Sequence, residues 1–319
     1  MCLSTRGSVL SKQQELPMIE LPKGRSLLKD GLRRLLKRKL ATVCLVVIAA
    51  YFLLAGFIYL AEFFDWQIGP TLWQEQAGES YAPPSSENIF GTDIFGQSVL
   101  RKTLYGAKIS ITVALCASLV SIAIGVPLGA IGGYFRGFVD EIIVWIYSTL
   151  SSVSYILLIL AFAVVLRERS ILGHKLTGIT AVYLAIGLTS WVGICRLIRG
   201  EVIKHKNRDY ILAAVSYGCS RRRIIFRHLL PNVFHIVIID FSLRFVAFIH
   251  AEVILSFLGL GEANRPSWGA MINDARMELS RGVWWQMAAA TAAIFIISLA
   301  LNIFGDALRD SLDPKLRVL

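Results

Sequence analysis

Long apolar runs alternate with short polar segments along nearly the whole chain. Six of these runs are about 20 residues long, enough for a helix to cross a bilayer core of roughly 30 Å. A helix satisfies its own backbone hydrogen bonds in lipid, so runs of this length favour helical spans. The pattern therefore predicts an all-α integral membrane protein with six transmembrane helices, at residues 41–63, 110–131, 141–166, 177–195, 233–257 and 286–304.

Charged residues are distributed unevenly between the two sides that these spans define. The 319 residues are 55% hydrophobic and carry a formal net charge of +11. If the N-terminus is cytoplasmic, the inner segments 1–40, 131–141, 196–235 and 305–319 hold 23 of the 33 Lys and Arg and 10 of the 22 acidic residues. Segments rich in Lys and Arg stay on the cytoplasmic side. Both termini are therefore expected in the cytoplasm, and the basic balance reflects topology and not nucleic-acid binding.

This topology divides the chain into five segments. A basic cytoplasmic tail (1–40) precedes an uncleaved first span (41–63), which is too long for a cleavable signal. A periplasmic loop (64–109), a transmembrane core (110–306) and a cytoplasmic tail (307–319) follow. Residues 24–40 mix Lys and Arg with Leu, which fits either an amphipathic helix on anionic membrane lipid or a simple stop to translocation. In the loop, Thr92 or Asp93 is expected to cap a short helix that ends at Leu104.

Candidate catalytic and metal-binding chemistry is sparse. The five cysteines form no CxxC pair, so neither a disulfide framework nor a zinc site is expected. The five histidines are scattered, and no Ser/His/Asp or HExxH arrangement is apparent. The chain also lacks the GxxxxGK[ST] loop that cradles nucleotide phosphates. We therefore expect no catalytic residue, no metal site and no cofactor bound by this chain.

The polar segment 208–232 lies between the fourth and fifth spans and is well punctuated. Asp209 is placed to cap one helix, and Gly218 is placed to close it in a left-handed turn. Ser220 is placed to cap a second helix, which Pro231 then limits. Two short helices around a glycine, held against the cytoplasmic face of a membrane, have the shape of a docking element for a partner.

The side chains of this segment offer a partner several kinds of contact. The first helix, 210–217, is about 12 Å long. Its small residues Ala213 and Ala214 permit close approach, and its larger side chains are anchors of the kind that dominate interfaces. The expected anchors are Tyr210, Ile211 and Tyr217. Three arginines follow, which either bind acidic groups or carbonyls of the partner or simply mark the cytoplasmic side: Arg221, Arg222 and Arg223.

Two further patterns predict packing. Glycines recur at every fourth position on one face of the second span, which lets another helix approach closely. They are Gly125, Gly129 and Gly133. Tryptophans near the outer face of the bilayer are expected to form an interfacial aromatic belt. They are Trp268, Trp284 and Trp285.

Several short motifs occur in a fixed order along residues 90–319. The segment 213–218 (AAVSYG), followed by Leu230-Pro231, resembles the cytoplasmic EAA loop of bacterial ABC importer permeases. More narrowly, the ordered set resembles the C-type subunit of the dipeptide/oligopeptide/nickel permease family. The other supporting motifs are GTD at 91–93, YGAKIS at 105–110, GGYF at 132–135, Glu252 before 255–261, PSWG at 266–269, GDALRD at 305–310 and Asp313-Pro314.

The resemblance implies a type I ABC importer permease fold, spanning the bacterial cytoplasmic (inner) membrane several times, with no enzymatic activity of its own. It implies a homologous permease subunit, two ATPase subunits that bind ATP and Mg, and an extracytoplasmic solute-binding protein. Short peptides are the family's commonest substrate, with nickel or another small solute as the alternative. The segment 196–235 then becomes the ATPase-coupling loop, acting through Asp209, Tyr210, Ala213, Ala214, Gly218, Arg221, Arg222, Arg223, Leu230 and Pro231.

Four places depart from the family's pattern. Leu212 stands where the EAA motif usually has Glu, and Gln97-Ser98 replaces a common Arg-Asp pair. The stretch 151–154 (SSVS) lacks a proline often found in the third span, and Glu262-Ala263 replaces a proline-rich pair. These departures leave the expected fold unchanged and bear on the substrate and on the strength of coupling.

The fifth span carries ionisable residues, which are costly at membrane depth and normally face protein or water. Asp240 and Arg244 are four positions apart, so they share a helix face and can pair. They lie either on the translocation path or a permease interface, or near the cytoplasmic end with side chains that reach toward water. Glu252 lies nearer the outer end, where it is expected to shape an outer gate or to cap the glycine turn that follows.

Two other functional classes fit the pattern less well. A secondary transporter driven by an ion gradient predicts acid relays in several spans and inverted repeats. Here the ionisable residues concentrate in one span, which counts against that class. An integral-membrane enzyme needs a polar catalytic cluster near one interface, and the outer loops offer none with recognisable spacing.

Overall fold

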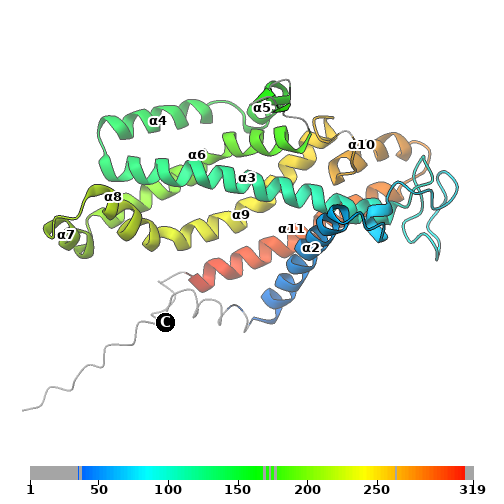
Figure 1. Cartoon of the computed structure of the whole chain (residues 1–319), viewed down its shortest axis with the longest axis horizontal. Helices are drawn as coiled ribbons and strands as arrows, with labels where there is room; N and C mark the ends of the chain where they lie inside the picture. Colours follow the sequence, from blue (N-terminus) through cyan, green and yellow to red (C-terminus); the bar gives the residue numbers. More distant parts are fainter. Residues whose placement is uncertain are drawn as a thin grey trace, which may run out of the picture.

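A computed structural model describes residues 35, 38–167, 170–171, 174–175, 178–262 and 264–312. The expected amphipathic tail, Ala263 and the Asp313-Pro314 motif lie largely or wholly outside these residues. The chain forms an elongated helical bundle (Figure 1). The short helices α7 (Asp209–Ser216) and α8 (Arg221–Arg223) lie at one end, and α10 (Trp268–Leu279) lies toward the other. We call these the α7 end and the α10 end.

Membrane-spanning helices dominate the described part of the chain, which confirms the all-α membrane class. Among the described residues, five single runs are long and apolar enough to cross a membrane. They are α2 (Lys39–Phe63), α3 (Val99–Phe135), α6 (Ile179–Lys206), the run from α8 through α9 (Leu230–Phe257), and α11 (Trp285–Leu312). The first span begins within two residues of its expected start. α6 and α11 continue well past residues 195 and 304, because a helix does not have to end where its apolar run ends.

The third span is bent, so the expectation of one continuous helix over 141–166 is wrong. α4 (Phe138–Ser151) and α5 (Tyr155–Arg167) meet at 94°. The hydroxyl groups of Thr149 and Ser152 donate to carbonyls of the preceding turn, Trp145 O at 2.8 Å and Thr149 O at 2.7 Å. Such bonds compete with the helical ladder and bend helices. An antiparallel pair of two-residue strands, β1 (Ser170–Ile171) and β2 (His174–Lys175), then leads toward α6.

The segment before α3 is folded by turns, and the expected short helix ending at Leu104 is wrong as a separate element. A single 3₁₀ turn, η1 (Gly69–Leu72), follows α2. The Asp93 carboxylate accepts the backbone N–H groups of Phe95 at 3.0 Å and Gln97 at 2.8 Å, which makes a turn. The helix starts only after Ser98 and runs without a break into the second span.

The glycines of the second span form the seam between α3 and α6, as predicted. A Cβ added at Gly125 would meet the Trp191 carbonyl at 2.6 Å, and one at Gly129 would meet the Cys195 carbonyl at 2.5 Å. A Cβ at Gly133 would meet the Arg199 carbonyl, one turn further along α6, at 2.8 Å. The two helices therefore approach through backbone at three successive turns, which only glycine permits.

Two of the three tryptophans expected in an aromatic belt are instead buried. Trp268 is 0% exposed and donates its indole N–H to the Thr103 carbonyl at 2.9 Å. Trp285 is 7% exposed and donates to the Thr92 carbonyl at 2.8 Å. Both bonds tie α10 and α11 to α3 and the segment before it. Trp284, at 57% exposure, alone of the three keeps the exposure that a belt requires.

Candidate functional site

The first helix of the candidate coupling loop ends as predicted but begins differently. Gly218 has φ +71°, and Cys219 N–H donates to the Ala214 carbonyl at 3.1 Å. Gly218 N–H donates to the Val215 carbonyl at 2.9 Å, which completes a Schellman cap. At the start, Arg208 occupies the N-cap position, so the prediction of Asp209 as the cap is wrong. Asp209 is the first helical residue, where its charge favours the positive end of the helix dipole.

The second helix does not stop at Pro231, contrary to expectation. It begins after Ser220, whose side chain makes no capping bond, and continues through a π-helical stretch, η2 (Ile224–Leu229), into α9. Within this stretch Leu230 N–H donates to the Ile225 carbonyl, five residues earlier. Proline lacks an N–H and crowds the carbonyl four residues before it. The wider π turn before Pro231 accommodates the missing N–H and the proline ring, so the helix continues through this residue.

One face of α7 is anchored in the protein itself. Ile211 is 1% exposed and Ala214 is 6% exposed, and both join a cluster that includes Ile224 and Leu229. The expectation that Ile211 and Ala214 face a partner is therefore wrong. Ala213 is exposed, as a partner contact requires.

The opposite face of α7 presents large side chains to the surroundings. Leu212 is 54% exposed, Val215 52% and Tyr217 87%. Tyr210 is less open, at 37%, and its hydroxyl lies 2.9 Å from Nδ1 of His205. Partial burial raises the pKa of the Tyr210 hydroxyl.

Contacts beyond α7 hold the loop in place. Lys206 Nζ, at the end of α6, donates to the Tyr134 carbonyl at 2.7 Å and stands over the Tyr134 ring. The three arginines of α8 are exposed, and within the described residues none forms an ion pair. Arg221 lies over the Phe135 ring, with its guanidinium carbon 5.9 Å from the ring centroid. Where η2 meets α9, Leu230 is half-buried and Pro231 is exposed.

Asp240 and Arg244 pair as predicted. Nε of Arg244 donates to both carboxylate oxygens of Asp240, at 2.8 and 2.7 Å. The pair lies far from the start of α9: about 21 Å of helix separates Leu230 from Arg244. The Arg244 guanidinium packs on Gly193 of α6, where an added Cβ would meet it at 2.2 Å. Arg244 therefore lies along α6 and does not extend toward the helix end.

Glu252 is 1% exposed and held by hydroxyl groups. Ser110 Oγ donates to Oε2 and Ser256 Oγ donates to Oε1, both at 2.6 Å. Ser256 also packs against the glycine turn, because an added Cβ at Gly261 would meet its Oγ at 2.3 Å. Glu252 thus reaches the turn after α9 through Ser256, and its role as an outer gate or as a cap of that turn stays a prediction.

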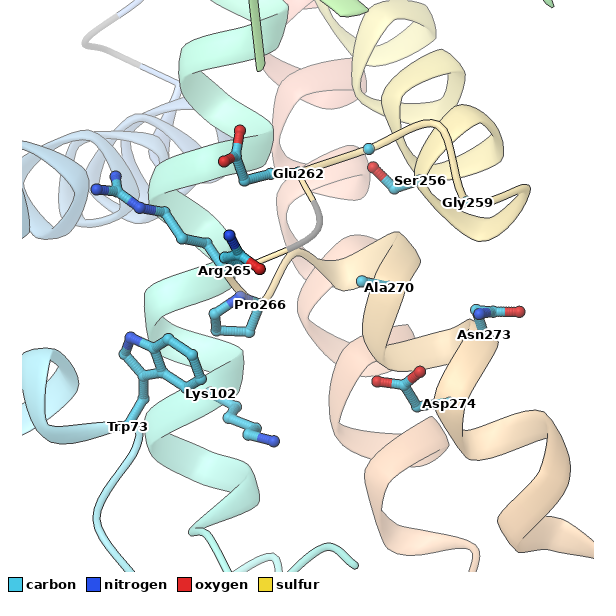
Figure 2. Close-up of a pocket in the computed structure, with 12 residues that line it drawn as sticks. Trp73, Lys102, Ser256, Gly259, Glu262, Arg265, Pro266, Ala270, Asn273 and Asp274 are labelled. Carbon is cyan, nitrogen blue, oxygen red and sulfur yellow. The ribbon is translucent and has the colours of Figure 1, made fainter. Parts of the chain in front are cut away.

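A polar cavity of 340 Å³ opens beside this turn, near the α10 end (Figure 2). The Lys102 side chain in its wall forms an ion pair with Asp93. Glu262, also in the wall, accepts the first backbone N–H of α6, Ile179 N, at 3.0 Å and so caps that helix. This bond gives the Glu262 departure from the family pattern a structural role that the sequence did not suggest.

A second polar cluster was missed by sequence reasoning. Glu62, at the end of α2, accepts the Tyr105 hydroxyl at 2.5 Å and forms an ion pair with Lys108. Arg265 lies 3.7 Å from the same carboxylate. The one available signal was the position of Lys108 itself, because a buried lysine requires a nearby acid.

Comparison with known proteins agrees with this architecture. Residues 125–318 match the family described as the binding-protein-dependent transport system inner membrane component, and residues 26–84 match the N-terminal TM domain of oligopeptide transport permease C. The dipeptide transport system permease protein DppC of Bacillus subtilis (strain 168) is 36% identical over 312 residues, which cover 96% of this chain and 91% of that protein. The oligopeptide transport system permease protein OppC of the same organism is 33% identical over 296 residues, 92% of each chain.

The fold also resembles that of a solved transporter. A chain of the MetNI methionine ABC transporter in an inward-facing conformation superimposes with a TM-score of 0.51 at 15% identity, covering 66% of this chain and 96% of that chain. A likeness at this identity concerns the fold alone. Taken with the family match over residues 125–318 and the relatives above, it leads to one assignment. The chain belongs to the inner-membrane permease family of binding-protein-dependent ABC importers, in its oligopeptide permease C branch.

Proposed function

We propose that this permease carries short peptides into the cell by alternating access. Relatives named as dipeptide and oligopeptide permeases, similar over more than nine tenths of this chain, support peptides as the cargo. The chain would pair with a homologous permease, receive cargo from a solute-binding protein, and rely on two separate subunits to bind ATP and Mg and to hydrolyse the nucleotide. The missing phosphate loop in this chain supports that division of labour.

The proposed coupling to the ATPase rests on the two faces of α7. Ile211 and Ala214 fix one face to the bundle, and the Gly218 cap fixes the end of the helix. The other face exposes Leu212, Val215 and Tyr217, large side chains of the kind that anchor interfaces. One face of α7 packs against the bundle and the other presents apolar side chains to a partner. A movement of that partner can therefore be transmitted through α7 to α6 and α9.

Leu212 belongs to the face that would meet the ATPase. Its side chain is more than half exposed, so the glutamate that the EAA motif usually has there would not disturb the packing of this chain. We infer that leucine at this position replaces a charged contact with an apolar one. Coupling is expected to persist, because the buried anchors of α7 are intact.

Reconstitution with the partner subunits tests this assignment. In proteoliposomes, Tyr217→Ala is expected to reduce peptide-stimulated ATPase activity and peptide uptake together by about tenfold, a loss typical of a central interface anchor. Trp284→Ala, which removes an exposed aromatic that directly precedes α11 and lies outside the coupling loop, is the matched control and should leave both rates unchanged. Gly218→Val, which strains a left-handed turn, should act like Tyr217→Ala by tilting α7.

The two parts of the proposal fail in different ways. Normal coupling in a correctly inserted Tyr217→Ala complex would contradict the role of α7. Uptake of nickel, but not of any di- or oligopeptide, by the wild-type complex would contradict the cargo and leave the coupling test intact.

A further inference from the structure

A cavity of 480 Å³ lies at the bend between α4 and α5, where α6 and α9 complete its wall. Its size falls within the range of about 300–1,000 Å³ typical of small-molecule sites. Arg244 comes from the middle of α9, Arg196 comes from the cytoplasmic half of α6, and hydroxyl groups lie around them. The polar wall consists of Ser151, Tyr155, Thr189, Ser190, Arg196 and Arg244.

The positive charge in this cavity is only partly balanced. Of the three guanidinium nitrogens of Arg244, only Nε donates to Asp240. The two terminal nitrogens lie against Gly193 and form no hydrogen bond with any described residue. Arg196 makes one hydrogen bond, to Ser151 Oγ at 3.2 Å, and stands over the Tyr147 ring at 5.1 Å. Within the described residues no carboxylate forms an ion pair with Arg196.

A guanidinium group in the middle of a membrane span is costly unless an anion or water accompanies it, and Arg244 lies near the centre of the expected fifth span, 233–257. Arg244 and the more exposed Arg196 face one cavity that has no acidic residue in its wall. Guanidinium is planar and presents paired N–H donors, which match the two oxygens of a carboxylate. The hydroxyls of Tyr155 and Ser190 lie 2.9 Å apart, so one donates to the other and the pair adds one further O–H donor beside the arginines.

We propose that this cavity binds the terminal carboxylate of a peptide in transit, through Arg196 and the free edge of Arg244. The inference rests on the proposed function and specifies one substrate contact. Asp240 is a positioning residue, because its two contacts to Nε hold the Arg244 plane across the face of α6. A peptide with a free C-terminus would be favoured over the same peptide as a C-terminal amide.

Transport in proteoliposomes with all partner subunits tests the proposal. The solute-binding protein is saturated with either a dipeptide or its C-terminal amide, so that its own selectivity does not enter. The wild type is expected to transport the free acid about tenfold faster than the amide, the effect of one charge-assisted hydrogen bond. Arg196→Gln should reduce this ratio to within about twofold by slowing the acid alone, and Arg196→Lys should restore part of it.

Arg244→Gln leaves the Asp240 carboxylate without its partner in the membrane. The double variant Asp240→Asn with Arg244→Gln removes that unpaired charge, and both variants are measured. Both should lose the preference for the acid. Arg101→Gln removes a surface arginine that pairs with Glu75 at 3.2 Å and should keep the wild-type ratio.

Two results would overturn the proposal. One is a wild-type ratio near one, and the other is an unchanged ratio in Arg196→Gln and in the double variant. If these variants also lose co-purified anionic phospholipid, the arginines are assigned to a lipid headgroup instead. Absence of peptide uptake by the wild-type complex would instead refute the proposed function itself, and the carboxylate site with it.

Discussion

The Arg199 guanidinium donates two hydrogen bonds to the Asp140 carboxylate, from Nε to Oδ1 at 2.5 Å and from Nη2 to Oδ2 at 2.7 Å. The pair joins the first turn of α4 to α6. α4 buries only Ile143 and Tyr147, so it has few apolar contacts of its own. Arg199–Asp140 therefore fixes the start of the bent third span, at the same end of the bundle as α7.

Breaking this pair should loosen α4. We expect Asp140→Asn to lower the free energy of unfolding in detergent by about 1–3 kcal/mol, because it leaves a partly buried guanidinium without its charged partner. Lys204→Gln is the control, since it removes a pair with Glu201 in which the lysine is 68% exposed. That variant should change stability by less than about 0.5 kcal/mol. Equal effects of the two variants would show that Arg199–Asp140 has no special role.

The seam between α3 and α6 should reject a single methyl group. Gly129→Ala places a Cβ 2.5 Å from the Cys195 carbonyl, and overpacking of this kind costs about 1–3 kcal/mol. Gly200→Ala is the matched control in α6, because no atom lies within 4 Å of the added Cβ. It should be neutral or slightly stabilising through helix propensity. Thermal unfolding of the two purified variants separates the seam from a general intolerance of alanine.

Glu252 should be needed for its hydrogen bonds more than for its volume. Glu252→Leu leaves the Ser110 and Ser256 hydroxyls without their acceptor, and we expect a loss of about 2 kcal/mol or more. Glu252→Gln retains one oxygen acceptor and should lose less. Adding Ser110→Ala and Ser256→Ala to Glu252→Leu should recover part of the loss, because these two hydroxyls are then no longer left without an acceptor. A triple variant less stable than Glu252→Leu would contradict this account.

Glu278 of α10 should make the α10 end sensitive to pH. Burial raises the pKa of its carboxyl, and the nearby charges of Asp93 and Asp274 raise it further. Oε2 of Glu278 has no hydrogen-bond partner among the described residues. The folded state therefore holds this proton more tightly than the unfolded state. Stability should fall as pH rises from the ordinary value of about 4.3 through the raised pKa, and then stay low.

Neutralising this carboxyl should remove part of that dependence. We expect Glu278→Gln to raise the unfolding temperature at about pH 8 by roughly 2–4 °C, with a smaller difference near pH 5. Glu79→Gln changes an exposed acid of the segment before α3 and should leave the profile unchanged. Parallel profiles for the wild type and Glu278→Gln would refute the assignment.

Features that depend on local spacing could be predicted from the sequence. The length of an apolar run located α2 to within two residues, and four-residue spacing placed Gly129 and its neighbours on one face. The same spacing predicted the pairing of Asp240 with Arg244. The left-handed conformation of Gly218 could also be predicted, because glycine has no side chain to oppose a positive φ.

Features that depend on distant segments could not be predicted. Glu62 and Lys108 lie 46 positions apart, and no pattern in either segment points to the other. Which face of α7 is buried depends on where η2 and α6 lie, so Ile211 could not be separated from Leu212. The bend after Ser151 depends on whether serine hydroxyls turn back toward the helix, and serine also occurs within straight helices.

The backbone contact between α3 and α6 also limits how the two helices can move. Glycines every fourth residue create three matched positions along the seam, and a slide between them would push larger side chains of α3 into the carbonyls of α6. The smallest permitted slide is one full repeat, about 6 Å of helix. Slides smaller than this repeat are therefore blocked, and the seam favours movement of α3 and α6 as a pair. A displacement at the α7 end would then reach the α10 end as a tilt of the pair.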